Sequence, residues 1–297
     1  MSTLHTITGK VVRCTQETND TWTLDIDVAS ENRHYQAGQF ISIDPHQFSV
    51  LSNWIAYLEH CKGRKEQVRA YSMASAPHEP YVSITIKPET YQPGQTAYPP
   101  LMSCLLASDW LQGRDITFKG YTGAYTLRYL DEEPYRHIRT VVHITAGSGI
   151  VPNFALLKDA LHNNKHPHIH HTLINVNKTL SDIIFRQQLD ELAQQHPQRL
   201  QLLHLLTRQQ NLQQLPENLP SGPRYQTGRP TLQLLQQYMT QTQNTLVYAC
   251  GPALTRWQKQ RAQQTGESLK PRFIESVTQL VHELGVAKNC YKTEKYG

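Results

Sequence analysis

The first half of the chain contains short runs in which apolar and polar residues alternate. Residues 22–28 and 81–87 alternate in this way, and residues 38–43 and 115–119 form two further apolar runs next to glycine. Strict alternation predicts a strand with one buried face. Short strands at this spacing, separated by glycine and proline, predict a small antiparallel β-barrel.

The second half changes to longer units, in which each strand pattern is followed by a helix pattern. We expect strands at 140–145, 172–176, 200–206 and 245–249, and helices at 154–161, 182–192 and 231–239. Repeated units of this kind predict a parallel sheet covered by helices on both faces. The predicted fold class is therefore β plus α/β, with an antiparallel barrel over residues 1–133 followed by a doubly wound parallel sheet over 134–297.

Chemistry-bearing residues cluster where the predicted parallel strands end. The loop Gly147-Ser148-Gly149 lies between a strand and a helix, where glycines let the backbone approach a pyrophosphate at the helix N-terminus. Residues 177–179, 207–208 and 250–251 follow three other strands. Because ligands bind at the carboxyl ends of such strands, this edge is predicted to be a nucleotide site.

A second candidate site is the run Arg69-Ala70-Tyr71-Ser72, which enters the strand region of the first half. In an extended chain, Arg69 and Tyr71 face one side and Ser72 faces the other. A flavin nucleotide needs a cation for its phosphate, a ring to cover it and a polar atom near its reactive edge. These four residues alone are equally compatible with an ordinary strand entry.

Composition narrows the class of protein. The chain has 297 residues, enough for two domains, with 38 % hydrophobic residues, and its mean hydropathy is −0.54. No apolar window approaches a membrane span, and the start has no signal-peptide pattern. The net charge is +5, but the basic residues are dispersed, which argues against nucleic-acid binding and is compatible with an acidic protein partner.

The cysteines and histidines predict no metal or disulfide framework. Five cysteines are scattered without paired spacing, so a disulfide scaffold, a zinc site or an iron–sulfur cluster is not expected. The histidine-rich stretch 166–171 is better interpreted as a polar loop that runs into a strand. We expect a monomer in the reducing cytoplasm.

Residues 46–67 interrupt the strand pattern of the first half. Apolar residues at helical spacing are followed by the basic run 62–65, which predicts a short helix and a basic loop. This segment is either a solvated loop or a docking surface for an acidic partner, through Lys62, Arg64 and Lys65.

Taken together, the motifs resemble the ferredoxin–NADP reductase superfamily over nearly the whole chain, from about Gly9 onward. The matching motifs are Arg-x-Tyr-Ser at 69–72, the glycine loop at 147–152, Cys-Gly-Pro at 250–252 and the acid and aromatic of the chain end at 294 and 296. In the flavin-pyrophosphate loop, which has Gly-x-x-Ser in the family, Pro100 replaces the glycine before Ser103. This departure leaves FMN open, although FAD is expected.

The resemblance implies roles for matching positions in flavin binding. Arg69 would hold a flavin phosphate, Tyr71 would stack on the isoalloxazine, Ser72 would bond its reactive edge and Tyr296 would cover the other face. The other residues expected to contact the flavin are Ala70, Ile86, Lys87 and Ser103.

The resemblance also implies a nicotinamide site. Cys250 would lie against the nicotinamide carbon that gives up the hydride, and Glu294 would complete a polar cluster with Ser72 and Cys250. The other residues expected to bind the nucleotide are Gly147, Ser148, Gly149, Thr207, Arg208, Tyr225, Gly251 and Pro252. Thr207-Arg208 is similar to the Ser-Arg of NADP-using relatives, and Tyr225 to a tyrosine that packs on the adenine. NADP(H) is therefore expected, with NAD(H) also used.

The function implied is that of a reductase that takes a hydride from NADPH onto FAD and passes electrons to a separate acidic protein. That partner would be a ferredoxin or the iron–sulfur component of an oxygenase, because this chain has no cysteine pattern for its own cluster. Two alternatives remain, an NADH-dependent diaphorase or flavin reductase, and a non-catalytic flavin-binding electron-transfer subunit.

Overall fold

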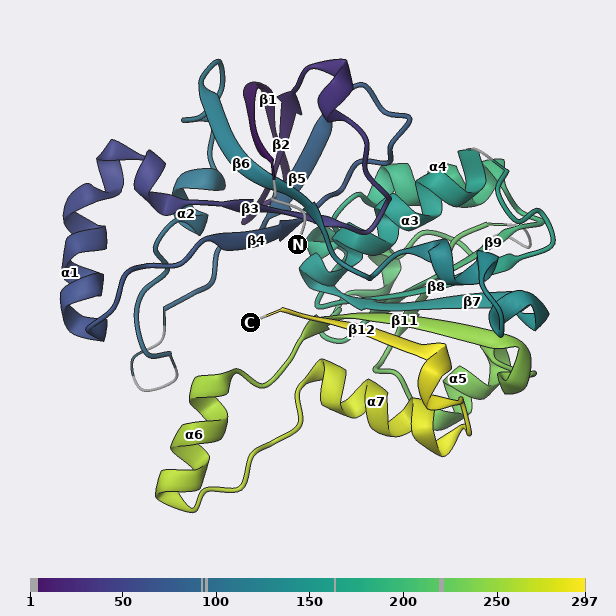
Figure 1. The fold of residues 1–297 in the computed structure, drawn as a ribbon. Helices are drawn as coiled ribbons and strands as arrows, with labels where there is room; N and C mark the ends of the chain where they lie inside the picture. Colours follow the sequence, from purple (N-terminus) through teal and green to yellow (C-terminus); the bar gives the residue numbers. More distant parts are fainter. Residues whose placement is uncertain (1–4, 92, 94–95, 163, 219–221, 297) are drawn as a thin grey trace. The chain divides into compact units, whose positions relative to one another are not determined.

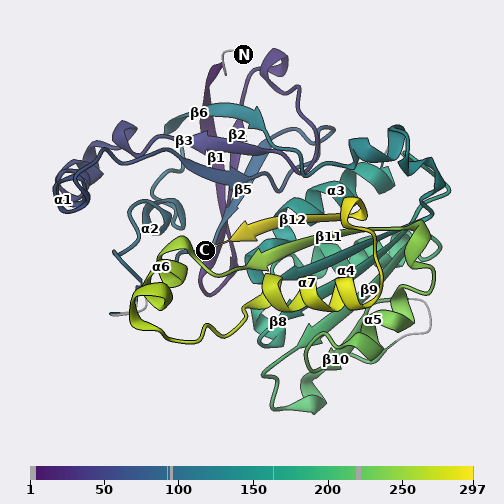
Figure 2. The same cartoon turned by 60° about the horizontal axis from the view of Figure 1, so that its bottom comes forward.

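The computed structural model describes residues 5–91, 93, 96–162, 164–218 and 222–296 (Figure 1; Figure 2 shows the chain turned). The chain divides into two compact units. The first, here called the barrel unit, comprises Met1–Ala124 and Arg256–Glu267, and the parallel-sheet unit comprises Tyr125–Thr255 and Ser268–Gly297. An antiparallel sheet in one unit and a parallel sheet in the other confirm the predicted fold class.

The barrel unit is built on a six-stranded antiparallel sheet with the order β4-β3-β6-β1-β2-β5. The strands are β1 (Thr6–Thr18), β2 (Thr21–Asp27), β3 (Phe40–Ile43), β4 (Arg69–Ser72), β5 (Val82–Ile86) and β6 (Asp115–Thr122). The two outer strands also meet, because Met73 pairs with Ile84 and the amide of Ala74 donates to Ser83 O at 2.7 Å. The sheet therefore closes on itself, as a barrel does.

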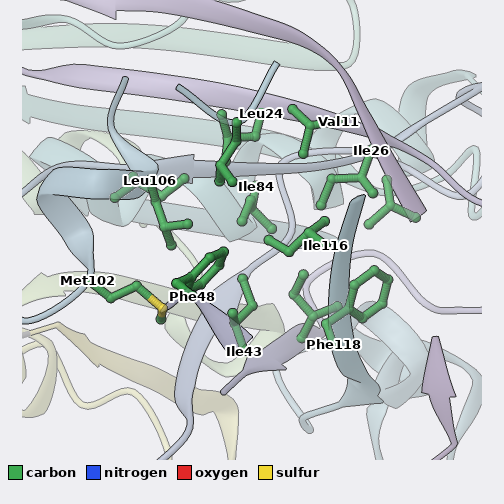
Figure 3. Close-up of a cluster of buried hydrophobic side chains, with 14 of the residues drawn as sticks. Val11, Leu24, Ile26, Ile43, Phe48, Ile84, Met102, Leu106, Ile116 and Phe118 are labelled. Atoms are coloured by element: carbon green, nitrogen blue, oxygen red, sulfur yellow. The ribbon is translucent and has the colours of Figure 1, made fainter. Parts of the chain in front are cut away.

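The apolar residues of the alternating strands point into one core (Figure 3). Phe48 and Met102 come from outside the strands and contribute to the same core. The segment 46–67 forms helix α1 (Ser52–Lys62), and its Ile55 and Leu58 are buried in this core. The insertion is therefore a packed part of the barrel unit rather than a solvated loop, although Arg64 and Lys65 remain exposed.

The parallel-sheet unit has the strand order β10-β9-β8-β7-β11-β12. Its strands are β7 (Thr140–Ala146), β8 (His170–Asn177), β9 (Leu200–Leu206), β10 (Arg224–Thr227), β11 (Thr245–Pro252) and β12 (Tyr291–Tyr296). Helices α3 (Ile150–His162) and α4 (Arg186–Gln195) cover one face, and α5 (Leu232–Tyr238) and α7 (Phe273–Glu283) cover the other (Figure 1). The chain winds outward from β7 and then returns to β11, so the strand order reverses between β7 and β11.

The parallel-sheet unit begins before the boundary that the sequence predicts. Tyr125 packs edge-on against Tyr248, with ring centroids 5.0 Å apart, and the Tyr248 hydroxyl donates to Thr126 O at 2.6 Å. These contacts hold Tyr125 and Thr126 on the parallel-sheet unit, and the two units divide after Ala124 rather than near residue 133. Two further short helices, α2 (Ser103–Leu106) and α6 (Arg256–Thr265), belong to the barrel unit by their contacts.

Candidate functional site

The carboxyl end of β11 places Cys250 between two polar neighbours. Cys250 pairs with Thr145 of β7 on one side and with Glu294 of β12 on the other. Directly paired residues of parallel strands share a face, so the three side chains form a row on one face of the sheet. This row lies at the point where the strand order reverses, which is where doubly wound sheets bind ligands.

The Cys250 thiol is held in its protonated form. Burial raises its pKa well above the ordinary value, the charge of Glu294 raises it further, and a hydrogen bond with Tyr296 acts in the opposite direction. Cys250 is fully buried. The amide of Ala253 donates to the Tyr296 carbonyl at 3.0 Å, so the pairing of β11 with β12 extends to Tyr296. A neutral S–H group can contact a ring, but it is a poor nucleophile.

The glycine loop packs directly on the backbone of β11. A Cβ at Gly149 would lie 2.1 Å from the Cys250 carbonyl oxygen, so only glycine fits. Gly147 has φ 54°, in the left-handed region that glycine adopts most readily. Helix α3 begins at Ile150, directly after the loop, and its first N–H groups suit an anion. This geometry fits a pyrophosphate held beside Cys250.

Cationic residues follow the outer strands of the same sheet edge. Asn177 of β8 pairs with Leu206 of β9, and the amide of Arg208 donates to Lys178 O at 2.8 Å. The segments that follow the carboxyl ends of these two strands therefore lie side by side. Lys178, Arg208 and Arg229 are exposed there, and within the described ranges none of them has an ion pair. Sequence reasoning missed Arg229, because the four-residue strand β10 before it has no clear pattern.

Asn177 presents a buried amide at this edge. Neither its side-chain nitrogen nor its side-chain oxygen has a hydrogen-bond partner among the described residues. Leaving such a group unsatisfied costs roughly 1–3 kcal/mol. A polar partner from outside the described chain would remove this cost, and the ribose or phosphate of a dinucleotide offers both donors and acceptors. The orphaned amide therefore fits a nucleotide site.

Tyr225 lies on β10, a strand that the sequence does not predict, and its ring is covered in this structure. It is 5 % exposed, and its ring stacks on His204 with centroids 4.9 Å apart. Its hydroxyl donates to Asp190. Thr207 donates its hydroxyl to Asn177 O at 3.2 Å. The adenine contact that the sequence suggests for Tyr225 would require His204 and Asp190 to move away from its ring and hydroxyl.

In the barrel unit, β4 carries the predicted flavin residues. Arg69 donates through Nη2 to Glu66 Oε2 and through Nη1 to Gln67 O, both at 2.5 Å. Its side chain is 37 % exposed, and three of its five N–H groups have no partner among the described residues. Burial raises the pKa of Tyr71, which keeps its hydroxyl protonated, while Ser72 is buried on the opposite face of the strand. An exposed, oriented guanidinium fits a phosphate.

The remaining predicted flavin residues have different surroundings. Ile86 is buried and pairs with Trp22, and Lys87 forms an ion pair with Asp20 at 2.7 Å. Ser103 begins α2, which is only four residues long. Ala70 is exposed between Arg69 and Tyr71. The loop that contains Pro100 thus leads into a single short helical turn.

A buried polar chain lies beneath the glycine loop. Asn153 donates to Gly149 O at 3.2 Å and faces His143 Nδ1 through its oxygen at 2.8 Å, so this histidine nitrogen carries a proton. His143 Nε2 then accepts from His171 Nδ1 at 3.2 Å. Burial is the main reason that the pKa of His143 falls from 6.5 to about 4, and it also lowers the pKa of His171. Both imidazoles are neutral at pH 7.

We expect these histidines to make the folded chain unstable in acid. Because His143 has a lower pKa when folded than when unfolded, its contribution is complete above about pH 6.5 and is lost as pH falls through about 4. The loss for His143 alone amounts to about 3 kcal/mol over that interval. Urea unfolding should be measured at several pH values. As the pH falls, the free energy of unfolding should decline less steeply for His143→Gln than for the unchanged chain. Parallel declines would contradict this account.

Comparisons with known proteins agree with the nucleotide site. Residues 144–259 match the family of oxidoreductase NAD-binding domains. The chain is 30 % identical over 132 residues to a nitrate reductase [NADH] of Volvox carteri, an alignment that covers 44 % of this chain and 14 % of that protein. It is 25 % identical over 252 residues to NADH-cytochrome b5 reductase 2 of Coccidioides immitis, covering 83 % of this chain and 68 % of that one. The chain thus matches only a small part of the nitrate reductases.

Solved structures share the fold of the whole chain. The cytochrome b5 reductase domain of Ulva prolifera nitrate reductase superposes with a TM-score of 0.66 at 15 % identity, covering 98 % of this chain and 97 % of that one. A cytochrome P450 reductase of Amycolatopsis gives a TM-score of 0.67 at 17 % identity, covering 98 % and 69 %. Across the described ranges, no helix combines the length and apolar content needed to cross a membrane.

Proposed function

We propose that this chain is a member of the ferredoxin–NADP reductase superfamily that binds FAD and NAD(P)H and moves electrons from a nicotinamide nucleotide to a protein acceptor. The matched NAD-binding domain and the fold shared with solved reductases support this proposal. FAD supplies the redox chemistry when bound, because it accepts a hydride and can release electrons singly. The chain itself supplies binding, orientation and exclusion of water.

The observation that carries this proposal is the position of Cys250. It lies between Thr145 and Glu294, and Gly149 of the nucleotide loop is in contact with its backbone. A nucleotide whose pyrophosphate is held by this loop would bring its nicotinamide to a buried, neutral thiol. The thiol limits how the ring can lie, and Glu294 adds a negative charge beside it, which favours the positive charge that develops on a nicotinamide as it gives up hydride.

The purified protein should test this proposal directly. We expect it to be yellow, to contain equimolar FAD, and to lose its flavin absorbance when NADPH is added without oxygen. A flavin that binds but is not bleached by either NADPH or NADH would favour the alternative of a non-catalytic electron-transfer subunit. A colourless protein that FAD does not restore would refute both.

The proposed acceptor is a separate acidic iron–sulfur protein, either a ferredoxin or an oxygenase component. Arg64 and Lys65 of the inserted segment are exposed and available for such a partner, whereas Lys62 is already paired with Glu66. Charge steering would make the rate of electron transfer fall with ionic strength. We also propose a cytoplasmic location, on the scattered spacing of the cysteines in the sequence.

A second candidate is an NADH-dependent reductase of a haem protein. It is favoured by one observation, the alignment over 83 % of this chain with a protein named NADH-cytochrome b5 reductase. Reduction of a cytochrome b5 and of a ferredoxin under the same conditions would separate the two candidates.

We expect NADPH to be preferred over NADH, with NADH still used. Arg208, Lys178 and Arg229 offer positive charge to the 2′-phosphate at adjoining strand ends. A charge-assisted contact is worth roughly 1.5–3 kcal/mol, or about 10- to 100-fold in preference. Arg208→Ala should therefore lower kcat/KM for NADPH by roughly that factor and leave NADH nearly unchanged.

The matched control is Arg224→Ala. It removes an exposed arginine at the start of β10, away from the carboxyl end of that strand, which leads to Arg229. It should not change the ratio of the two kcat/KM values. An NADH preference in the unchanged chain, or equal loss with both nucleotides in Arg208→Ala, would contradict this assignment.

A further inference from the structure

Glu66 is a buried acid between two basic side chains. Its residue is 5 % exposed and its side chain 2 % exposed. One carboxylate oxygen accepts from Lys62 Nζ at the end of α1, and the other accepts from Arg69 Nη2 at the start of β4. The acid therefore links the inserted helix to the arginine of the Arg-x-Tyr-Ser motif.

The carboxylate of Glu66 stays ionised despite its burial. Burial alone would raise its pKa, but hydrogen bonds from Lys62 and Arg69 outweigh that effect and lower the pKa below its usual value. A buried charge is tolerated only when it is paired in this way. The pairing fixes two long, flexible side chains against one rigid group.

The backbone around Glu66 is itself anchored. The Glu66 amide donates to Glu59 Oε1 at 2.9 Å, and the same carboxylate oxygen faces His46 Nε2 at 2.9 Å. His46 Nδ1 in turn faces Asp44 Oδ1 at 2.7 Å. The carbonyl of Gln67 accepts the second bond of Arg69, so the guanidinium is held at two points.

We propose that Glu66 is a positioning residue, which orients the Arg69 guanidinium for a flavin phosphate. This inference rests on the proposed function, in which Arg69 binds that phosphate. Two N–H groups of Arg69 are used by Glu66 and Gln67, and three remain for the ligand. An arginine that is already ordered loses less rotamer entropy when it binds.

Lys62 gives the arrangement its positive charge. Glu66 alone would cancel the charge of Arg69, and a neutral pair attracts a phosphate weakly. With Lys62 in place, the group of Lys62, Glu66 and Arg69 carries one net positive charge. The inserted helix thus has a role in the flavin site through its last residue.

The test is the affinity of the flavin-free full-length chain for FAD, measured by quenching of flavin fluorescence. Glu66→Gln should weaken FAD binding by roughly 10-fold, because Arg69 loses its charged partner and the Gln67 carbonyl becomes its main anchor. Simple electrostatics predicts the reverse, since this change removes a negative charge beside the phosphate site. The sign of the change therefore separates positioning from charge.

Three further variants complete the experiment. Glu31→Gln removes an exposed acid of the same unit and should leave the affinity unchanged. Lys62→Met should weaken FAD binding, because Glu66 then cancels the charge of Arg69. In an Arg69→Ala background, Glu66→Gln should have no further effect on the affinity.

The outcomes are distinct. Unchanged or tighter binding in Glu66→Gln, while Arg69→Ala binds weakly, would overturn the positioning role and leave the proposed function intact. If Glu66→Gln weakens FAD binding by the same factor in the Arg69→Ala background, Glu66 acts through the stability of the fold. That result would also overturn the positioning role. Full affinity in Arg69→Ala would overturn both this inference and the phosphate contact on which it rests.

Discussion

Replacement of Cys250 by alanine, or of Glu294 by glutamine, should slow flavin reduction by NADPH about 100-fold or more while FAD stays bound. Both side chains lie in the row at the carboxyl end of β11 and β12. Neither belongs to the barrel unit, which carries all the predicted flavin residues except Tyr296. Alanine removes the sulfur that limits how a nicotinamide can lie. Glutamine keeps the shape of Glu294 but removes the negative charge.

Stopped-flow measurement of flavin bleaching under anaerobic conditions gives the rate. The matched control is Cys290→Ala, because Cys290 is also a buried cysteine of the parallel-sheet unit but lies just before the start of β12, at the opposite end of the strands. This control should keep the rate of the unchanged chain. If Cys250→Ala and Glu294→Gln both reduce flavin at the normal rate, the hydride site lies elsewhere.

Arg69→Ala should lose most of its flavin. Its charge-assisted bonds to a phosphate are worth roughly 1.5–3 kcal/mol, so the FAD dissociation constant should rise about 10- to 100-fold. The FAD dissociation constant of Arg69→Lys should lie between those of the unchanged chain and Arg69→Ala, because lysine keeps the charge without the fork of N–H groups. The flavin content after gel filtration and the dissociation constant from titration both report the effect.

A second arginine of the barrel unit provides the control. Arg13 is also paired with a carboxylate, Asp25, at 2.6 Å, and Arg13→Ala should keep the normal amount of FAD. Circular dichroism should show that both variants are folded. Full flavin retention in Arg69→Ala would remove the Arg-x-Tyr-Ser motif from the flavin site.

The sequence predicts those strands and helices whose hydrophobic pattern is complete within consecutive residues. Strand β9 runs from Leu200 to Leu206 as predicted, because a leucine-rich run interrupted only by Gln201 and His204 suits a largely buried strand. The long strand β1 escapes prediction because Gly9 interrupts its apolar alternation. The structure supplies the reason for that glycine, since a Cβ there would lie 2.6 Å from the side chains of Ile26 and Val28.

The candidate site is predictable to a lesser degree. The residues at strand ends follow from the parallel pattern, so Gly149 and Cys250 could be placed on one edge of the sheet. The pairing of Arg69 with Glu66 could not, because it depends on the path of the chain between α1 and β4. The orphaned amide of Asn177 also has no sequence signal, because an unsatisfied group is recognised only when all its neighbours are known.

The missing side chains of Gly149 and Gly251 have a mechanical consequence. The backbone of Gly149 touches the peptide of Cys250, and a Cβ at Gly251 would lie 2.6 Å from the ring of Phe273 on α7. Because the nucleotide loop, the end of β11 and the start of α7 pack this closely, we expect a shift of the loop to displace the end of β11 as well. A nucleotide that displaced the loop by a fraction of an ångström would carry the Cys250 peptide with it. Under the proposed function, nucleotide binding and hydride geometry would thus be coupled by direct backbone contact, which the absence of a Cβ at Gly149 and at Gly251 makes possible.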